Sequence, residues 1–130
     1  MITFTQIVLK NKRNKYNRRR KNKKKPLPGL GGNPQQRGMC LKTFTKSPKK
    51  PNSAQRKVAK IFLLRTHKTI TAYIPGEGHS LQDYANVLIQ GGGAKDVPGI
   101  HYKLMRGVRD LKGIKGRQNG RSKYGTKRIL

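Results

Sequence analysis

Alternating apolar and polar positions predict five short β-strands in the central part of the chain. The strands are expected at residues 38–46, 56–65, 69–74, 87–90 and 100–105. In the first, Met39, Leu41 and Phe44 indicate a strand with imperfect alternation, and in the second Val58, Ile61 and Leu63 form the apolar set. The third, TITAYI, is rich in β-branched residues, which favour strands.

Loops rich in proline and glycine separate these strands, with SPKKPNS at 47–53, PGEGH at 75–79 and AKDVPG at 94–99. Five short strands within about 70 residues predict an all-β fold, a small five-stranded barrel of the oligonucleotide-binding type. An SH3-like barrel is the alternative. A helical turn is expected at 107–113, and a basic C-terminal tail without an apolar period at 114–130.

The predicted strands divide the chain into three parts. Residues 1–37 are expected to form a short N-terminal helix followed by a basic extension. The helix is expected because the apolar residues Phe4, Ile7 and Val8 stand at positions i, i+3 and i+4. Residues 38–113 form the predicted barrel and 114–130 the tail. The proline- and glycine-rich stretch at 26–34 reads as an irregular linker.

The net charge is the strongest indication of a partner. The 130 residues include 32 Lys and Arg against four Asp and Glu, which gives a formal charge of +28. Like charges at this density destabilise a compact state unless a polyanion neutralises them. Nucleic acid is such a polyanion, and binding is favoured because the Lys and Arg side chains release the counter-ions condensed on its phosphates. No apolar run reaches the roughly 18 residues of a membrane span, so no membrane partner is expected.

The positive charge is most concentrated at residues 10–25, where eleven of the 16 residues are Lys or Arg. Such a segment buries almost no apolar surface and is expected to order only against phosphates. A flexible solubilising tail is one alternative. A cleavable mitochondrial presequence is another, although those are rich in Arg and Ser and amphipathic, and this segment is rich in Lys and Asn.

Residues that could support catalysis or metal binding are sparse. Glu77 and His79 lie on one predicted turn, but a catalytic pair also needs a nucleophile and an orienting group. Cys40 is the only cysteine and is expected to be a small buried apolar residue. The glycines at 91–93 lack the lysine of a phosphate-binding loop. No enzymatic activity, metal or cofactor is therefore expected.

The loop between the first two predicted strands carries the clearest chemistry. Its two prolines, Pro48 and Pro51, restrict the backbone and lower the entropy lost when neighbouring cations approach phosphates. The cations gathered there are Lys49, Lys50, Arg56 and Lys57. Asn52 and Ser53 add short polar groups that suit the shallow minor groove of A-form RNA. An ordinary basic surface loop is the alternative interpretation.

Five motifs occur in an order and spacing that resemble a known family. They are PQQRGMCLK at 34–42, PKKPNSAQR at 48–56, PGEGHSLQ at 75–82, GGGAKDVPGIHY at 91–102 and RSKYG at 121–125. Together they resemble small-subunit ribosomal protein twelve, the universal S-twelve family. The segments IPGEGH, RGVRDLKGI and GRSKYG are similar to its mitochondrial members. The sequence departs from the family pattern where Gln-Gly-Gly-Gly-Ala stands in place of Arg-Gly-Gly-Arg-Val, at 90–94.

The resemblance implies a structural rRNA-binding protein at the decoding centre, which supports translational accuracy at the A site. The implied decoding-centre residues are Pro48, Pro51, Asn52, Ser53, Asp96, Pro98 and Gly99. The implied rRNA-binding residues are Lys21, Lys23, Lys24, Lys25, Lys49, Lys50, Arg56, Lys57, Lys95, Arg121 and Lys123.

The implied partners are small-subunit rRNA, the A-site tRNA, the mRNA codon and other small-subunit proteins. The implied location is the mitochondrion, with plastid or bacterial cytoplasm as alternatives. A free-standing chaperone of single-stranded RNA is the alternative function, but it would stack bases on aromatic residues, and the chain has only five Tyr, three Phe and no Trp.

The basic extension yields the first prediction. Residues 10–25 should be unfolded in the free protein and become ordered on rRNA, because eleven like charges repel one another until phosphates neutralise them. Amide hydrogen exchange, measured on the free chain and on the chain bound to small-subunit rRNA, tests this. Strong protection of these amides in the free chain would contradict it.

Overall fold

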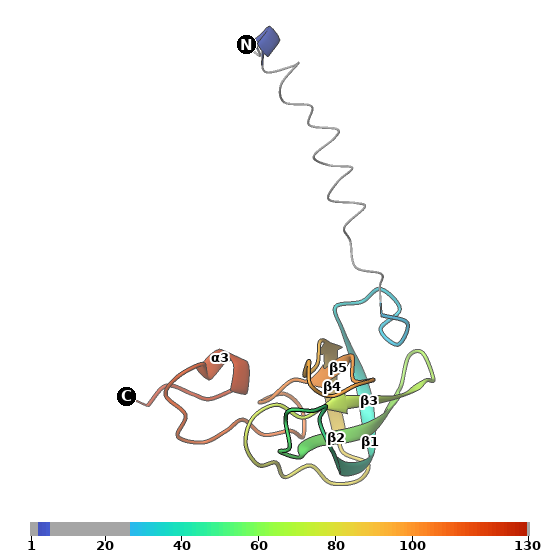
Figure 1. Ribbon diagram of the computed structural model, residues 1–130, viewed down its shortest axis with the longest axis vertical. Helices are drawn as coiled ribbons and strands as arrows, with labels where there is room; N and C mark the ends of the chain where they lie inside the picture. The colour runs from blue at the N-terminus through green and yellow to red at the C-terminus, as the bar shows by residue number, and fades with distance from the viewer. Residues whose placement is uncertain (1–2, 6–26, 130) are drawn as a thin grey trace.

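The computed structural model describes residues 3–5 and 27–129, and five strands between residues 35 and 104 form a closed barrel (Figure 1). The strands are β1 (Gln35–Lys46), β2 (Arg56–Leu63), β3 (Thr69–Tyr73), β4 (Asn86–Gly91) and β5 (Tyr102–Leu104). Their order around the barrel is β1-β2-β3-β5-β4, with β3 and β5 parallel and the other pairs antiparallel. The predicted all-β barrel is confirmed. The extension at 10–25, with Lys21, Lys23, Lys24 and Lys25, lies outside the described residues.

Strand β1 closes the barrel because it pairs with two neighbours. Its first half pairs with β4, from Gln35 opposite Gln90 to Met39 opposite Asn86, and the stretch from Gly38 onward pairs with β2. The register with β2 shifts between Cys40 and Lys42, which is a β-bulge. A bulge bends and twists a strand, so β1 can pass from one neighbour to the other.

The inward face of β1 does not carry the apolar residues that indicated this strand. Gln36, Gly38 and Cys40 are buried, whereas Met39 and Leu41 are only half-buried and Phe44 is exposed. There is no room for a side chain at Gly38, because residues of β2 and β4 already fill the barrel interior next to it. A Cβ atom on Gly38 would lie 2.5 Å from Ile61 Cγ2 and 2.6 Å from Ile89 Cδ1. A glycine therefore faces inward at this level of the barrel.

The remaining core follows the predicted pattern more closely. Val58, Ile61 and Leu63 of β2 are fully buried, as predicted, and so is Cys40. Ala59 is also buried and interrupts the strict alternation of β2. The predicted linker packs onto the barrel rather than running free of it: Leu30 is buried, and its carbonyl accepts a hydrogen bond from the Gln36 side chain at 2.7 Å.

The C-terminal segment is folded, which its polar composition did not indicate. The helical turn predicted at 107–113 is wrong, since Val108 and Leu111 form an isolated β-bridge there. A short helix, α3 (Arg121–Tyr124), follows and lies to one side of the barrel (Figure 1). The Arg117 guanidinium lies 4.0 Å from the centre of the Tyr124 ring. No helix among residues 3–5 and 27–129 is long and apolar enough to cross a membrane.

Glycine contacts hold this segment in place. Ile114 N donates to Tyr124 O at 3.1 Å, and the Thr126 hydroxyl donates back to Ile114 O at 2.6 Å. These bonds bring Gly125 against Gly107: a Cβ on Gly125 would lie 2.7 Å from Gly107 Cα. The chain packs backbone on backbone here, which only residues without side chains permit.

The core packing around Gly38 yields a prediction for stability. Gly38→Ala should destabilise the fold by about 1–3 kcal/mol, because the added methyl group overpacks a filled interior between Ile61 and Ile89. Urea unfolding of the purified chain measures the change. Thr45→Ala, at an exposed position of the same strand, is the control and should stay within about 0.5 kcal/mol of the unmodified chain. Equal stability of the two variants would contradict this packing.

Candidate nucleic-acid interface

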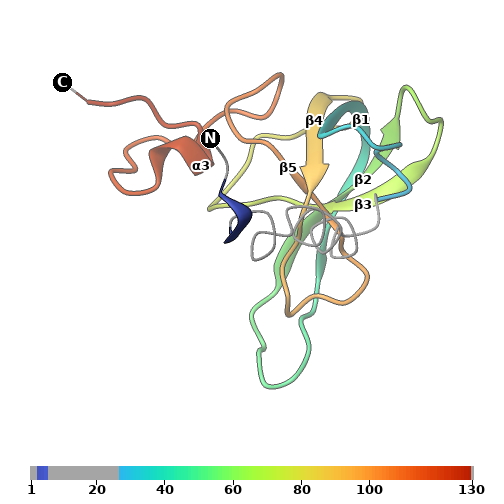
Figure 2. The ribbon, with the colours of Figure 1, turned by 90° about the horizontal axis from the view of Figure 1, so that it is seen from above.

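Two loops that are distant in sequence meet at one end of the barrel (Figure 2). One joins β1 to β2 over residues 47–55, and the other joins β4 to β5 over 92–101. Lys49 N donates to Asp96 O at 2.7 Å, and Lys46 Nζ donates to Pro98 O at 2.7 Å. The two segments that the sequence singled out separately therefore form one surface.

The carboxylate of Asp96 is the main link between the two loops. Asp96 Oδ2 accepts from Arg56 Nη2 at 2.7 Å and from Asn52 Nδ2 at 3.2 Å. The first contact is a charge-assisted hydrogen bond, the stronger kind. The hydrogen bond from Arg56 is also the largest cause of a lowered pKa of Asp96, below the ordinary aspartate value. Desolvation of the carboxylate opposes this shift, and the hydrogen bond from Asn52 adds to it.

Hydrophobic packing supports the second loop from below. Val97 and Ile100 are buried against Val58 of β2, with Tyr73 and Ala94 packed around them. Val97 directly follows Asp96 in the chain. The loop backbone is thus anchored in the interior, and the Asp96 carboxylate is presented to Arg56 from a fixed position.

The predicted decoding-centre residues occupy the surface formed by these two loops. Pro51, Asn52 and Ser53 are exposed in the first loop, and Pro98 and Gly99 in the second, while Pro48 and Asp96 are half-buried. The Lys50–Pro51 peptide bond is cis, and Asn52 N donates to Lys49 O at 3.0 Å. The hydrogen bond closes a turn from Lys49 to Asn52, and Ser53 directly follows it.

The predicted cations divide into two kinds. Lys49, Lys50, Lys57 and Lys95 are exposed, and among the described residues none of them is paired with an acid. Arg56 is half-buried and is held by Asp96, which raises its pKa. Arg56 therefore stabilises the loops from within, a position that the sequence did not indicate because its partner lies in the other loop.

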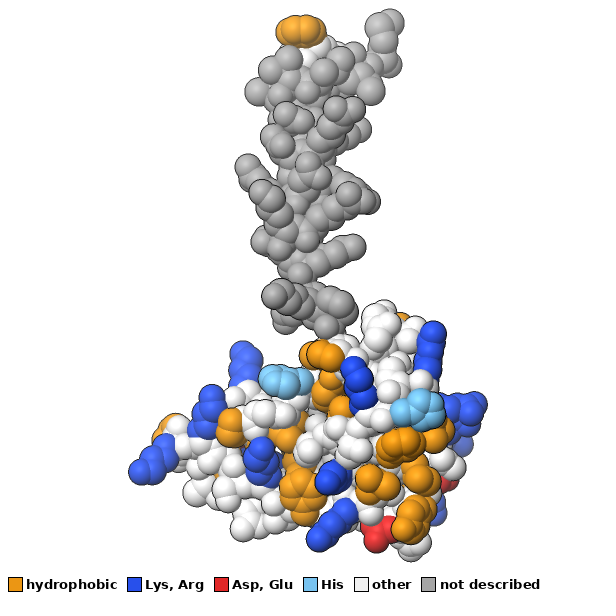
Figure 3. Space-filling model, turned by 90° about the vertical axis from the view of Figure 1, so that its right-hand side faces the viewer, with side chains coloured by type: hydrophobic (Ala, Val, Ile, Leu, Met, Phe, Trp, Pro, Cys, Tyr) orange, Lys and Arg blue, Asp and Glu red, His pale blue; other side chains and the backbone are white. Residues whose placement is uncertain are grey.

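Arg121 and Lys123 do not lie with the two loops. They belong to α3, which Figure 2 shows well apart from them. Figure 3 shows Lys and Arg side chains spread over a whole face of the molecule, with little acidic surface between them. The described part of the chain thus offers cations on more than one face, which suits a polyanion that surrounds the protein.

His79 and Cys40 are titratable groups outside the two loops, and their surroundings shift their pKa values. His79 Nδ1 accepts from Leu81 N at 3.2 Å, and burial chiefly lowers the pKa of this imidazole, with Lys57 and Arg106 lowering it further. Burial raises the pKa of the Cys40 thiol, which keeps it protonated and unreactive. In the described part of the chain, no group of three or more His, Cys, Asp or Glu residues could hold a metal ion.

Comparison with known proteins gives concordant matches. The family described as Ribosomal protein S12/S23 matches residues 20–129. A protein of Bigelowiella natans named "Small ribosomal subunit protein uS12m" is 57% identical over 113 residues, which cover 86% of this chain and 89% of that protein. A protein of Eimeria tenella named "Small ribosomal subunit protein uS12c" is 52% identical over 128 residues, covering 98% and 100%.

The Asp96–Arg56 pair yields a pH-dependent prediction. Because the folded-state pKa of Asp96 is lowered, the bond stabilises the joined loops fully above the ordinary aspartate pKa. That contribution should disappear as the pH falls through the lowered value. Carbon-13 NMR titration of the Asp96 carboxyl tests this. Arg56→Gln should raise the pKa of Asp96, whereas Lys57→Gln, which removes an equal charge from an exposed neighbour, should change it little. Equal shifts in both variants would contradict the pairing.

Proposed function

The chain belongs to the ribosomal protein S12/S23 family, and we propose that its joined loops act at the decoding centre of the small ribosomal subunit. Membership makes the chain a structural component of the small subunit, not an enzyme. Membership in this family favours a ribosomal protein over the alternative function, a free-standing RNA chaperone. The finer proposal is that the loops support translational accuracy at the A site.

The compartment follows from the two relatives. Both are named as organellar small-subunit proteins, one with the suffix m and the other with the suffix c, and the similarity spans most of each chain. The chain is accordingly an organellar protein, and we assign it to the mitochondrion, with the plastid as the alternative. Its partners there are rRNA and other ribosomal components; the A-site tRNA and the mRNA codon are proposed further partners.

The observation that carries the decoding proposal is the Asp96 carboxylate between the two loops. Asp96 binds both Arg56 and Asn52, so Asn52 is held by its side chain as well as by the turn around it. A side chain that is already ordered loses less conformational entropy on binding. The loop tip can therefore report the shape of an RNA helix instead of adapting to it.

Charge and shape have separate roles on this surface. The exposed lysines Lys49, Lys50, Lys57 and Lys95 would supply affinity through phosphates, which carry no sequence information. Asn52 and Ser53 are uncharged and exposed between them. Short neutral donors and acceptors suit the wide, shallow minor groove of A-form RNA and its 2′-hydroxyl groups. A correctly paired codon–anticodon helix offers a regular minor groove, and a mismatched one does not.

The energetic scale of such sensing is modest. One neutral hydrogen bond contributes about 0.5–1.5 kcal/mol net, which corresponds to a change of up to about tenfold in an equilibrium. The loops therefore need not bind the helix tightly. They need to keep their few polar groups in one position, which is the task of the Asp96 contacts.

The decisive experiment breaks the link from either side. Asp96→Asn and Arg56→Gln, in reconstituted small subunits, should each change the near-cognate error rate by up to about tenfold and in the same direction. Because both variants affect the Asp96–Arg56 contact, the double variant should change the error rate by less than the sum of the two single changes and should resemble Asp96→Asn, which also alters the Asn52 contact. Incorporation into the subunit and its salt dependence should stay nearly unchanged. A misreading reporter and sedimentation provide the two measurements.

Lys57→Gln is the matched control, because it removes a charge beside Arg56 without touching Asp96. It should weaken rRNA binding slightly and leave the error rate unchanged. Unchanged accuracy in Asp96→Asn and Arg56→Gln would refute the proposed role at the A site. A loss of subunit assembly equal in all three variants would show that the loops serve only as a basic anchor.

A further inference from the structure

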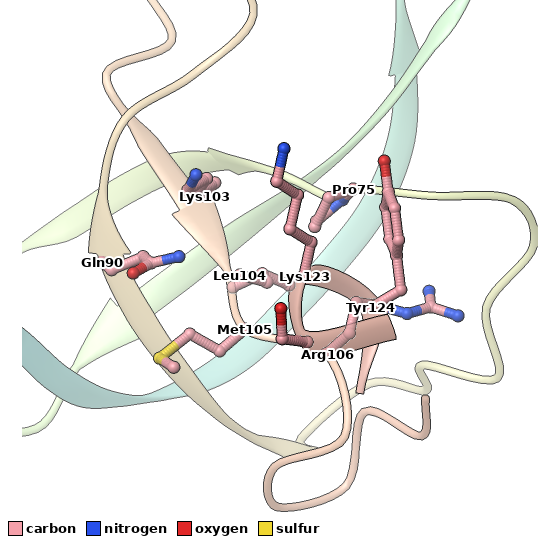
Figure 4. A pocket seen from close by; sticks show the side chains of 9 residues that line it. Pro75, Gln90, Lys103, Leu104, Met105, Arg106, Lys123 and Tyr124 are labelled. Atoms are coloured by element: carbon pink, nitrogen blue, oxygen red, sulfur yellow. The ribbon is translucent and has the colours of Figure 1, made fainter. Parts of the chain in front are cut away.

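A cavity of about 400 Å³ lies on the side of the barrel that carries α3 (Figure 4). Its walls come from the paired ends of β4 and β5, from the turn that follows β5, from Pro75 after β3 and from α3. Known small-ligand sites span roughly 300–1000 Å³, so the space suits a single small unit. This cavity is formed only because the C-terminal segment is folded against the barrel.

The polar groups of the cavity are cationic or neutral. Lys103, Arg106 and Lys123 contribute positive charge, and Gln90 and Ser122 contribute neutral polar atoms. None of the chain's four acidic residues lines it. A concave surface with charge of one sign focuses the electric field and attracts the opposite sign. The cavity therefore selects an anionic ligand.

The arrangement of the two lysines fits a phosphate group. Lys103 lies opposite Gln90 in the pairing of β5 with β4, and its chain passes over Gly92, where a Cβ atom would lie 3.3 Å from Lys103 Cε. Lys123 extends from α3, so the two lysines line the cavity from separate elements (Figure 4). Two ammonium groups on separate elements can thus approach one anion.

Arg106 adds charge to the wall but is already engaged. Its side chain is 7% exposed, and Nη1 donates to Gly78 O at 2.7 Å. Among the described residues, its Nε has no hydrogen-bond partner. Burying a guanidinium with no carboxylate beside it leaves a positive potential at this position. An anion in the cavity would offset that charge.

The rest of the wall is apolar and aromatic. Pro75, Leu104, Met105 and Tyr124 line it, and the Tyr124 ring is held on one side by Arg117 at 4.0 Å. A bare phosphate would not use such a surface, whereas an unpaired base packs against aromatic and apolar side chains. Cationic and apolar walls together match a nucleotide.

We propose that this cavity binds one unpaired nucleotide of RNA, with its phosphate between Lys103 and Lys123 and its base against the apolar wall. The proposal rests on the proposed function, in which the chain binds small-subunit rRNA, and identifies a second contact apart from the two loops. It gives Lys123 of α3 a specific role, and it adds Lys103, which sequence motifs did not single out.

The test combines a variant that fills the cavity with chemical labelling of lysines. Ser122→Phe adds bulk from an exposed helical position without changing charge, and Ser122→Ala is the matched control that leaves the cavity open. Reductive methylation, followed by mass spectrometry of the full chain, reports the access of reagent to each lysine. The chain is labelled free, with naked small-subunit rRNA, in assembled subunits and with inorganic phosphate alone.

We expect naked rRNA to protect Lys103 and Lys123 in the unmodified chain and in Ser122→Ala. In Ser122→Phe these two lysines should lose protection, while exposed lysines elsewhere, such as Lys68, should label as they do in the unmodified complex. The slope of log binding constant against log salt should also flatten by about 0.7, the value for one single-strand phosphate contact. Near-cognate accuracy should not change.

Other outcomes would overturn the proposal. Equal protection by inorganic phosphate alone would show a general anion site, and protection only in assembled subunits would indicate an acidic neighbouring protein. Unprotected Lys103 and Lys123 in a chain that still binds rRNA would refute the cavity proposal and leave the proposed function standing. A chain that does not bind small-subunit rRNA at all would refute the proposed function itself.

Discussion

One carboxylate organises the surface that we assign to decoding. With four acidic residues against 32 basic ones, the chain has few means of joining cationic segments to each other. Asp96 serves this purpose where the β1–β2 and β4–β5 loops meet, because it neutralises Arg56 and fixes Asn52 at once. Without it, the two loops would carry lysines alone and would repel each other. The exposed cations remain free for phosphates because the single anion of this surface is used internally.

The barrel could be predicted from the sequence because its strands have local signals. β2, β3 and β4 begin and end within two residues of the bounds inferred from alternation and from proline and glycine. The inward face of β1 could not be predicted from such local signals, because it depends on the side chains of the strands that face β1 across the barrel. Gly38 faces inward since Ile61 and Ile89 already fill that space.

The candidate site shows the same division between local and distant information. The motifs identified the exposed lysines and the polar loop tip, since those properties belong to the residues themselves. The pairing of Arg56 with Asp96 joins positions 40 residues apart, and no local pattern indicates it. For a related reason, no local sequence pattern predicts the cavity beside α3. Its lining residues are brought together by a C-terminal segment whose composition resembles that of an unfolded tail.

The glycine contacts of that segment have a consequence for how such chains vary in evolution. Gly107 and Gly125 pack closely because neither has a side chain. Every substitution at either position therefore adds bulk, and no conservative replacement exists. We expect exchanges between lysine and arginine at the exposed positions around these glycines to leave this backbone packing unchanged. The most constrained positions of the C-terminal segment are then those with no side chain at all, and one cation can replace another around them.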